Sequence, residues 1–278
     1  MAQEREDRED PEPVLMSYLG FWDPMRRLRT QPSPQCLVET RRALVDIYLK
    51  PVPGTYVVPH DDDVTMIQAL LLGPPGTPYE GGFFWFVMRC PPEYPAKPPQ
   101  VRLMTTDEGR VRFGPNFNES GMICLSILST WPGASWKPTH RIRVVLNALL
   151  SLMTTDPYFN EPALVRRKEP GEASGYNDFI RHETIRVAVC DMVEACLQKK
   201  APCHPILQVV ILKAFVHLYP NYVRIVRGQL HLNGRRMSDP FSARSGRYRY
   251  DVLLDRLQYL YHSTVCGCPQ GPGGDKRA

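Results

Sequence analysis

One stretch decides how this chain folds and what it does: Phe113-Gly114-Pro115-Asn116-Phe117-Asn118-Glu119-Ser120-Gly121-Met122-Ile123-Cys124-Leu125-Ser126-Ile127-Leu128. It places a Cys after a Gly-led turn, eight residues beyond the Asn of a Pro-Asn pair. A thiol there can carry an acyl group as a thioester, and an upstream Asn amide can stabilise the oxyanion that forms. A single free Cys is more often a buried core residue. The flanking sequence therefore has to decide between the two interpretations.

Four stretches in order, over about sixty residues, supply that context: Gly73 to Gly82, Tyr94-Pro95-Ala96-Lys97-Pro98-Pro99, Pro115-Asn116 with Cys124, and Trp136-Lys137-Pro138. Together they resemble the ubiquitin-conjugating enzyme (E2) family. There they correspond to the hairpin turn between the first two strands, the Tyr-Pro-x-x-Pro-Pro loop, the active-site His-Pro-Asn with its cysteine, and the Trp-x-Pro before the second helix. Residues 181 to 192 resemble the Z-type branch, which carries a C-terminal extension. The resemblance covers roughly residues 34 to 262.

This resemblance implies an α/β (α+β) conjugating-enzyme core. Its parts are an N-terminal helix, a four-stranded antiparallel meander and C-terminal helices, followed by an extra helical extension. It implies that Cys124 accepts ubiquitin or a ubiquitin-like modifier from an activating enzyme and passes it to a lysine amine of a protein substrate. A ligase is a possible further partner, and no cofactor or metal is implied. The alternative is a catalytically impaired binding module for the modifier or the activating enzyme.

The resemblance also assigns roles to residues. Asn116 is the candidate oxyanion donor, although a turn Asn often only bonds its own backbone. Glu161, in the gate-loop stretch 155 to 162, is the candidate for orienting the incoming lysine, with an exposed loop Glu as the alternative. Partner-binding positions are Arg41, Arg42, Pro95, Ala96, Lys137 and Pro138.

Several positions depart from the family pattern. Gly114 stands where the family has His, which puts the loop geometry in question. Ser126 replaces a common Asp, and Trp131-Pro132-Gly133 is inserted beside the nucleophile, where it could restrict which acceptors approach. Ala96 replaces a large apolar residue that ligases grip. A methyl group buries far less apolar area, so ordinary ligase binding should be weak.

Composition limits the class of protein. The N-terminus is charged and mixed in sign, which argues against a signal peptide. No apolar run approaches the ~20 residues of a membrane span. We therefore expect a cytoplasmic and possibly nuclear protein, with its eight Cys reduced. The spacing of Cys190, Cys196 and Cys203 does not match zinc sites.

Charge is uneven along the chain. Residues 205 to 262 hold nine Lys/Arg and three Asp/Glu, a net +6, which exceeds the whole-chain value of +5. A solvated basic face is the simplest interpretation, and an acidic protein partner is the sharper one. Nucleic acid is the weaker alternative, because no known binding motif accompanies the charge.

The expected organisation is a flexible segment over 1–33, a catalytic core over 34–200, a basic helical extension over 201–262 and a disordered tail over 263–278. A helix is expected over 35–49, with Leu37, Leu44, Ile47 and Tyr48 on its buried face. Strands are expected over 66–72, 83–90 and 100–103. Ile142, Leu146, Leu149 and Met153 predict a helix with a core-facing stripe, and Tyr176, Ile180, Val187 and Cys190 predict another.

Beyond these elements, we expect a helix from 205 to 219 that breaks at Pro220, and a short last helix over 251–261. One further function remains open from the residues alone. Cys124 paired with His140 would suggest a Cys–His hydrolase, but no third, orienting group can be placed.

Overall fold

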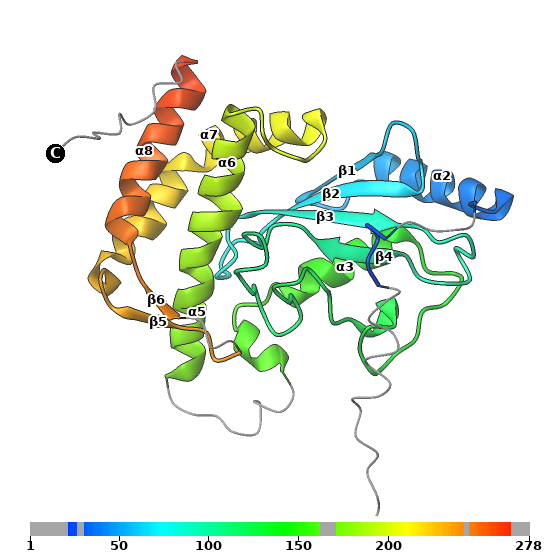
Figure 1. Cartoon of the computed structure of the whole chain (residues 1–278), viewed down its shortest axis with the longest axis horizontal. Coiled ribbons are helices and arrows are strands. Elements are labelled where there is room, and N and C mark those ends of the chain that lie inside the picture. The colour runs from blue at the N-terminus through cyan, green and yellow to red at the C-terminus, as the bar shows by residue number, and fades with distance from the viewer. Residues whose placement is uncertain (1–21, 27–30, 162–170, 242–244, 268–278) are drawn as a thin grey trace, which may run out of the picture.

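The computed structural model describes residues 22–26, 31–161, 171–241 and 245–267. Its centre is a four-stranded antiparallel sheet in the order β1-β2-β3-β4 (Figure 1). The strands are β1 (Thr55–Pro59), β2 (Met66–Leu72), β3 (Phe83–Arg89) and β4 (Gln100–Leu103). The meander is as predicted. The stretch Gly73 to Gly82 joins the second and third strands rather than the first two, because β1 precedes the expected hairpin.

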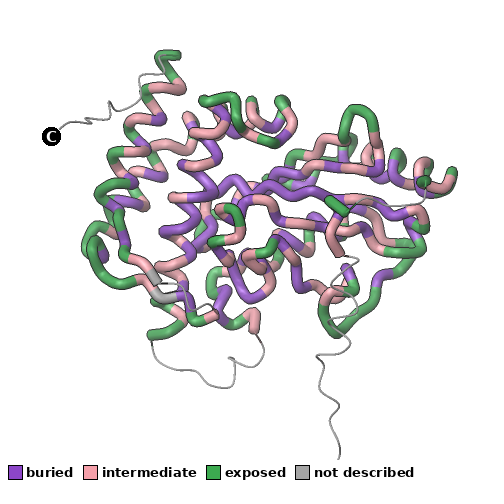
Figure 2. The backbone as a smooth tube through the Cα atoms, viewed as in Figure 1, coloured by how far each residue is buried: buried purple, intermediate pink, exposed green. Residues whose placement is uncertain are grey.

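Both faces of the sheet are buried, which explains the nearly continuous apolar sequence of β3. Side chains alternate across a strand, so Phe84, Phe86 and Met88 enter one apolar cluster. Phe83, Trp85 and Val87 enter a second cluster on the opposite face. Figure 2 shows buried backbone continuing from the strands into the neighbouring helices. The sheet is therefore the middle layer between two sets of helices.

The first cluster contains α2 (Pro34–Leu49) and α3 (Ile142–Leu152). The predicted stripe of α3 is confirmed, since Ile142, Leu146 and Leu149 are fully buried. The expected face of α2 was partly wrong. Its buried residues are Cys36, Thr40, Ala43 and Ile47. Tyr48 is 83% exposed, because it lies one position beyond the stripe that actually packs.

A long helical rod precedes the extension. It consists of α5 (Glu172–Glu183), a π-helical segment (Thr184–Asp191) and α6 (Met192–Leu197). The predicted contacts Tyr176, Ile180, Val187 and Cys190 are all buried along it. The first three join the first cluster, which contains α2 and α3. Cys190 joins the second cluster, on the opposite face of the sheet. The rod thus links the two layers.

The extension forms the second layer, with α7 (Pro205–Gly228), a short hairpin of β5 (Arg236–Ser238) and β6 (Ser245–Arg247), and α8 (Tyr250–Cys266). The expected break at Pro220 was wrong, because α7 continues eight residues beyond it. Proline costs one backbone hydrogen bond. The buried stripe on both sides of it, which includes Phe215, Tyr222 and Val226, offsets that cost. By length and composition alone, α7 is long and apolar enough to cross a membrane. This differs from the expectation that no apolar run approaches the length of a membrane span.

The extension is fastened to the rest of the chain by specific contacts. The hydroxyl of Tyr222 donates to the carbonyl of Gly81 at 2.7 Å. A Cβ on Gly81, which has φ +73°, would lie 2.8 Å from the Tyr222 ring, so this turn requires glycine. Arg256 pairs with Asp191 at 2.7 Å and also with Glu194. Because of these contacts and the shared apolar cluster, the extension packs as an integral part of the fold.

The ends of the chain differ in part from the expectation. Within the segment 1–33, Asp23 pairs with Arg102 of β4 at 2.7 Å, and the carbonyl of Pro24 accepts from Arg89 at 2.9 Å. Residues 22–26 therefore lie against the sheet. The final helix runs to Cys266, past the predicted end at 261. The remaining parts of the predicted flexible segment and tail, 1–21, 27–30 and 268–278, lie outside the described residues.

Candidate active site

The loop around Cys124 is a small antiparallel pairing. Phe117 and Ile123 form an isolated β-bridge, and the amide of Asn118 donates to the carbonyl of Met122 at 3.0 Å. In this register Asn116 lies opposite Cys124, and the Cys124 amide donates to the Asn116 carbonyl at 2.9 Å. The eight-residue spacing seen in the sequence is therefore the spacing that brings these two residues face to face.

Two further residues hold this loop in shape. A Cβ on Gly121 would lie 2.4 Å from the carbonyl oxygen of Leu103, so the turn approaches β4 too closely for any other residue. The Thr130 hydroxyl lies 2.5 Å from the Ile123 carbonyl and accepts from the Leu125 amide at 3.1 Å. Thr130 thus fixes the backbone on both sides of Cys124. Nothing in the sequence pattern points to this role, since a Thr in a loop is common.

The amide of Asn116 points along the backbone of the nucleophile. Its Nδ2 donates to the carbonyl of Cys124 at 3.0 Å. Its Oδ1 is buried and has no hydrogen-bond partner among the described residues. An amide nitrogen carries two N–H donors, and the Cys124 carbonyl occupies one of them. The geometry therefore serves loop-holding directly, and this bond engages only one of the two N–H groups.

The thiol of Cys124 lies at a partly enclosed position, with 8% of the residue exposed. Burial raises the pKa of this thiol above its ordinary value, the charge of Arg112 lowers it and the charge of Glu161 raises it. The thiol is thus not an activated thiolate of the kind found beside a histidinium. A thiol of this kind suits exchange with an already activated acyl group.

Glu161 stands on the other wall of the site. It follows the short helix Pro157–Asn160, and its carboxylate acts electrostatically on Cys124. The helix is anchored by Asn160, whose Nδ2 donates to the Leu152 carbonyl at 2.8 Å. Asn177 of α5 reaches the preceding segment, donating to the Thr155 carbonyl at 3.0 Å. The structure therefore brings Cys124, Asn116 and Glu161 into one site, although Pro162 lies outside the described residues.

The structure accounts for a glycine at position 114. The hydroxyl of Tyr79 donates to the Phe113 carbonyl at 2.5 Å, and a Cβ on Gly114 would lie 3.0 Å from that hydroxyl. Tyr79 is fully buried. In this chain a buried Tyr therefore crowds the position where the family carries His. The insert beside the nucleophile packs closely too, since a Cβ on Gly133 would lie 3.1 Å from Cβ of Ser126.

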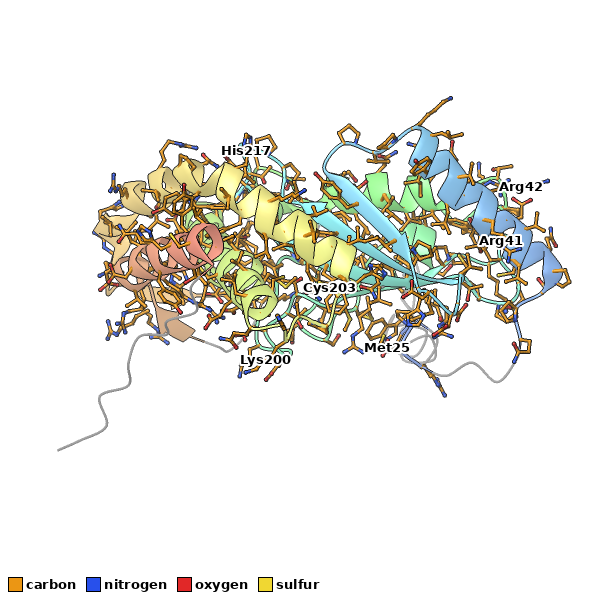
Figure 3. All side chains as sticks on the ribbon, turned by 90° about the horizontal axis from the view of Figure 1, so that it is seen from above. Met25, Arg41, Arg42, Lys200, Cys203 and His217 are labelled. Atoms are coloured by element: carbon orange, nitrogen blue, oxygen red, sulfur yellow. The ribbon has the colours of Figure 1, made fainter. Side chains whose placement is uncertain are left out.

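The predicted partner-binding residues lie in two places. Arg41 and Arg42 are exposed on α2, far from the extension in Figure 3. Arg42 pairs with Glu39 at 2.8 Å. Ala96, Lys137 and Pro138 are also exposed. Pro95 is buried, and its carbonyl accepts from the Trp136 indole at 2.7 Å. Pro95 therefore shapes the loop, and its ring is not available to a partner.

The hydrolase alternative finds no support in these contacts. His140 accepts from the Lys137 amide through Nδ1 and packs edge-on against Trp136 at 5.3 Å. The charged groups that act on the Cys124 thiol are Arg112 and Glu161. In the part of the chain that the structure describes, no group of three or more His, Cys, Asp or Glu is placed to hold a metal ion.

Sequence reasoning missed Arg112 and Phe241. The Arg112 guanidinium contacts the backbone just before Asn116, and Phe241 of the extension lies under it. No spacing rule connects two residues 129 positions apart.

Comparison with known proteins agrees with this geometry. Residues 39–179 match the model of the family described as ubiquitin-conjugating enzyme. Over 250 residues the chain is 48% identical to ubiquitin-conjugating enzyme E2 Z of Homo sapiens, covering 89% of this chain and 70% of that protein. It is 45% identical over 251 residues to the protein of the same name of Danio rerio, covering 89% of this chain and 75% of that protein. A probable ubiquitin-conjugating enzyme protein 17 of Caenorhabditis elegans is 38% identical over 147 residues, covering 50% of this chain and 20% of that protein.

Proposed function

Because the chain belongs to the ubiquitin-conjugating enzyme family, we propose that Cys124 accepts ubiquitin or a ubiquitin-like modifier as a thioester and passes it to a lysine amine of a protein substrate. The observation that carries this proposal is the antiparallel register that sets the Asn116 amide on the backbone of Cys124. A conjugating enzyme needs a thiol, an amide donor and a carboxylate around one carbonyl carbon. This loop carries the thiol and the amide, and Glu161, after the short helix Pro157–Asn160, carries the carboxylate.

The first step is a thioester exchange. The Cys124 thiolate attacks the modifier's C-terminal carbonyl on the activating enzyme, a new carbon–sulfur bond forms, and the activating enzyme's thiolate leaves. Burial raises the pKa of the Cys124 thiol, so only a small fraction is ionised at neutral pH. The exchange still proceeds because the acyl group is already activated and the attacking thiolate of a higher-pKa thiol is intrinsically more nucleophilic.

The second step forms the amide. A neutral lysine amine attacks the carbonyl of the Cys124 thioester, the thiolate leaves and the nitrogen loses a proton. Free lysine has a pKa near 10.4, so the site has to favour the neutral amine. Glu161 orients the ammonium group and accepts or relays its proton. The second N–H of Asn116 donates to the oxyanion of the tetrahedral intermediate.

A charging assay tests the assignment of the nucleophile. Purified chain is incubated with ATP and each candidate pair of activating enzyme and modifier, then resolved on a non-reducing gel. We expect a thiol-sensitive adduct on the unaltered chain and a thiol-resistant ester on Cys124→Ser. Cys266 is exposed, so Cys266→Ser is the matched control and should charge normally. Normal charging of Cys124→Ala through another Cys would refute the assignment.

The proposed partners follow from the same family membership. The exposed Arg41 and Arg42 on α2 offer positive charge to an acidic surface of the activating enzyme. The exposed Ala96, Lys137 and Pro138 offer a ligase a surface with little apolar area, so binding to ordinary ligases should be weak. The identity of the modifier is left to the charging assay above.

A further inference from the structure

Arg112 donates hydrogen bonds to the loop that carries Asn116. Its Nε donates to the Gly114 carbonyl at 3.1 Å, and one terminal nitrogen donates to the Pro115 carbonyl at 2.9 Å. The other terminal nitrogen donates to the carbonyl of Phe241 at 3.5 Å. A guanidinium is planar and presents its donors as a rigid fork. Arg112 therefore ties the two residues before Asn116 to a residue of the C-terminal extension.

The ring of Phe241 contacts residues that support the Asn116 loop and the Glu161 loop. The Arg112 guanidinium carbon is 5.2 Å from the ring centroid, within the range of a cation–π contact. The ring packs edge-on against Tyr176 of α5, with centroids 5.1 Å apart. It also contacts Tyr158 at 6.0 Å. Tyr158 belongs to the short helix that ends at Glu161. One side chain thus supports the Asn116 loop and the Glu161 loop together.

The position of Phe241 is itself fixed. Asp239 is 5% exposed, and its Oδ1 accepts from the Phe241 amide at 2.9 Å. Burial raises the pKa of this carboxyl, whereas the Phe241 amide and the charge of Arg112 lower it. The positive charge of Arg112 thus stabilises the ionised form of the Asp239 carboxyl. The hydrogen bond fixes the main chain at Phe241, and the ring packs between Arg112, Tyr158 and Tyr176.

We propose that Arg112 is a positioning residue for the active-site loop and that Phe241 holds it in place, so that the C-terminal extension sets the geometry around Cys124. This inference rests on the proposed function, because the geometry matters for the transfer from Cys124. It also gives the extension a role distinct from its charge.

Charge and geometry can be separated at Arg112. Arg112→Lys keeps the positive charge and loses the planar fork. Arg112→Gln keeps a hydrogen-bond donor and loses the charge. Phe241→Ala removes the ring, and Phe241→Leu keeps part of its apolar volume without the cation–π contact. The control is Tyr261→Ala, which removes an aromatic stack with Tyr219 at 4.1 Å in the extension, away from the loop.

The first measurement is alkylation of Cys124 by iodoacetamide as a function of pH, in the full chain carrying Cys266→Ser and Cys268→Ser, which removes both cysteines of the C-terminal Cys-x-Cys. Only the thiolate reacts, and Arg112 favours the thiolate. Arg112→Gln should therefore shift the profile to higher pH and slow alkylation at neutral pH by about two- to fivefold. Arg112→Lys should leave the profile close to that of the unaltered chain. This measurement does not depend on any modifier, so it can fail or succeed independently of the proposed function.

The second measurement is single-turnover transfer from preformed Cys124 thioester to free lysine, at low and saturating lysine. Displacing the loop should lower the maximal rate about tenfold in Phe241→Ala and Arg112→Lys, with a smaller loss in Phe241→Leu. The lysine concentration for half-maximal rate should change less than twofold. Tyr261→Ala should transfer within twofold of the unaltered chain, with melting temperatures recorded for every variant.

Three results would overturn the inference. One is Phe241→Ala transferring at the normal rate. Another is Tyr261→Ala losing as much as Phe241→Ala, which would indicate general loosening. The third is Arg112→Lys matching the unaltered chain in transfer. If Phe241→Ala does not fold, Phe241→Leu and the two Arg112 variants decide the question. A chain that never charges with any modifier would sink the proposed function. Alkylation would still test the inference, because a Phe241→Ala profile equal to that of the unaltered chain would show that Phe241 does not hold Arg112 near the thiol.

Discussion

Phe215→Ala tests whether the extension and the catalytic core unfold as one unit. Phe215 is fully buried in α7, in the apolar cluster that also contains Phe83, Trp85 and Val87 of the sheet. Its ring stacks on Tyr222 with centroids 5.9 Å apart. Removing a fully buried Phe costs about 3–5 kcal/mol, which includes the cavity that remains. That is a large fraction of the roughly 5–15 kcal/mol that stabilises a typical protein.

The expected shift in melting temperature follows from this cost. In a body of about 150–250 residues, each 1 kcal/mol lowers the melting temperature by roughly 2–4 °C. Phe215→Ala should therefore lower it by about 6–20 °C. Val209→Ala is the matched control, because Val209 lies on the same helix and is 51% exposed. It should shift stability by less than about 0.5 kcal/mol.

Two probes distinguish one unit from two. The four Trp residues lie at 22, 85, 131 and 136, all before the extension. Trp85 shares the apolar cluster with α7, so Trp fluorescence reports on the core when it is recorded in a Trp85→Phe background. Far-UV circular dichroism reports on all helices, including those of the extension. We expect Phe215→Ala to lower both transitions together, by the same amount. A lowered circular-dichroism transition with an unmoved Trp transition would refute the argument and show that the extension folds separately.

Further predictions concern the site and its partners. Asn116→Ala should still charge but transfer to free lysine about 10²–10³-fold more slowly, the cost of losing an oxyanion donor; equal loss of charging and transfer would favour pure loop-holding. Glu161→Ala should move the pH profile of lysine transfer to higher pH, because no carboxylate then accepts the proton of the attacking amine; an unchanged profile would make Glu161 an ordinary loop residue. Arg41→Glu combined with Arg42→Glu should slow charging most at low ionic strength, since exposed charges are screened beyond about 10 Å at 0.1 M salt; a loss independent of salt would contradict this, and Lys50→Glu at the end of the same helix is the control. Because burial raises the pKa of the Cys124 thiol, and because only the thiolate reacts, iodoacetamide alkylation should still be rising above pH about 8.5, the ordinary thiol pKa; a plateau below that pH would mean that the thiol is activated.

The packing of α7 also changes how the extension can be tested. Deleting residues 205–278 is the obvious experiment on a basic segment that follows a catalytic core. In the structure that deletion would expose Leu70, Phe83, Trp85 and Val87, which share a cluster with α7. We therefore expect a truncated chain to aggregate. Substitution at Phe241 is the cleaner test, because it leaves the apolar layer in place.

The sequence by itself predicted three strands of the sheet and the candidate nucleophile. The apolar runs 66–72 and 83–90 became β2 and β3, with β3 ending one residue before the predicted end. The spacing of Asn116 and Cys124 reflects a local antiparallel register, which adjacent residues enforce through their own backbone bonds. Local pattern suffices in such cases, because the groups that satisfy one another are close in the chain.

Tertiary contacts decided which faces are buried and which residues from distant segments pack together. Tyr48 lies outside the buried stripe of α2, since the stripe is chosen by what packs against the helix. Pro220 stays inside α7 because the buried residues on either side outweigh one lost hydrogen bond. Phe241 lies under Arg112 only because α7 returns the chain across the sheet and the hairpin then reaches the active-site loop. Periodicity records which residues are apolar, but the partner of each face is fixed only when the whole chain packs.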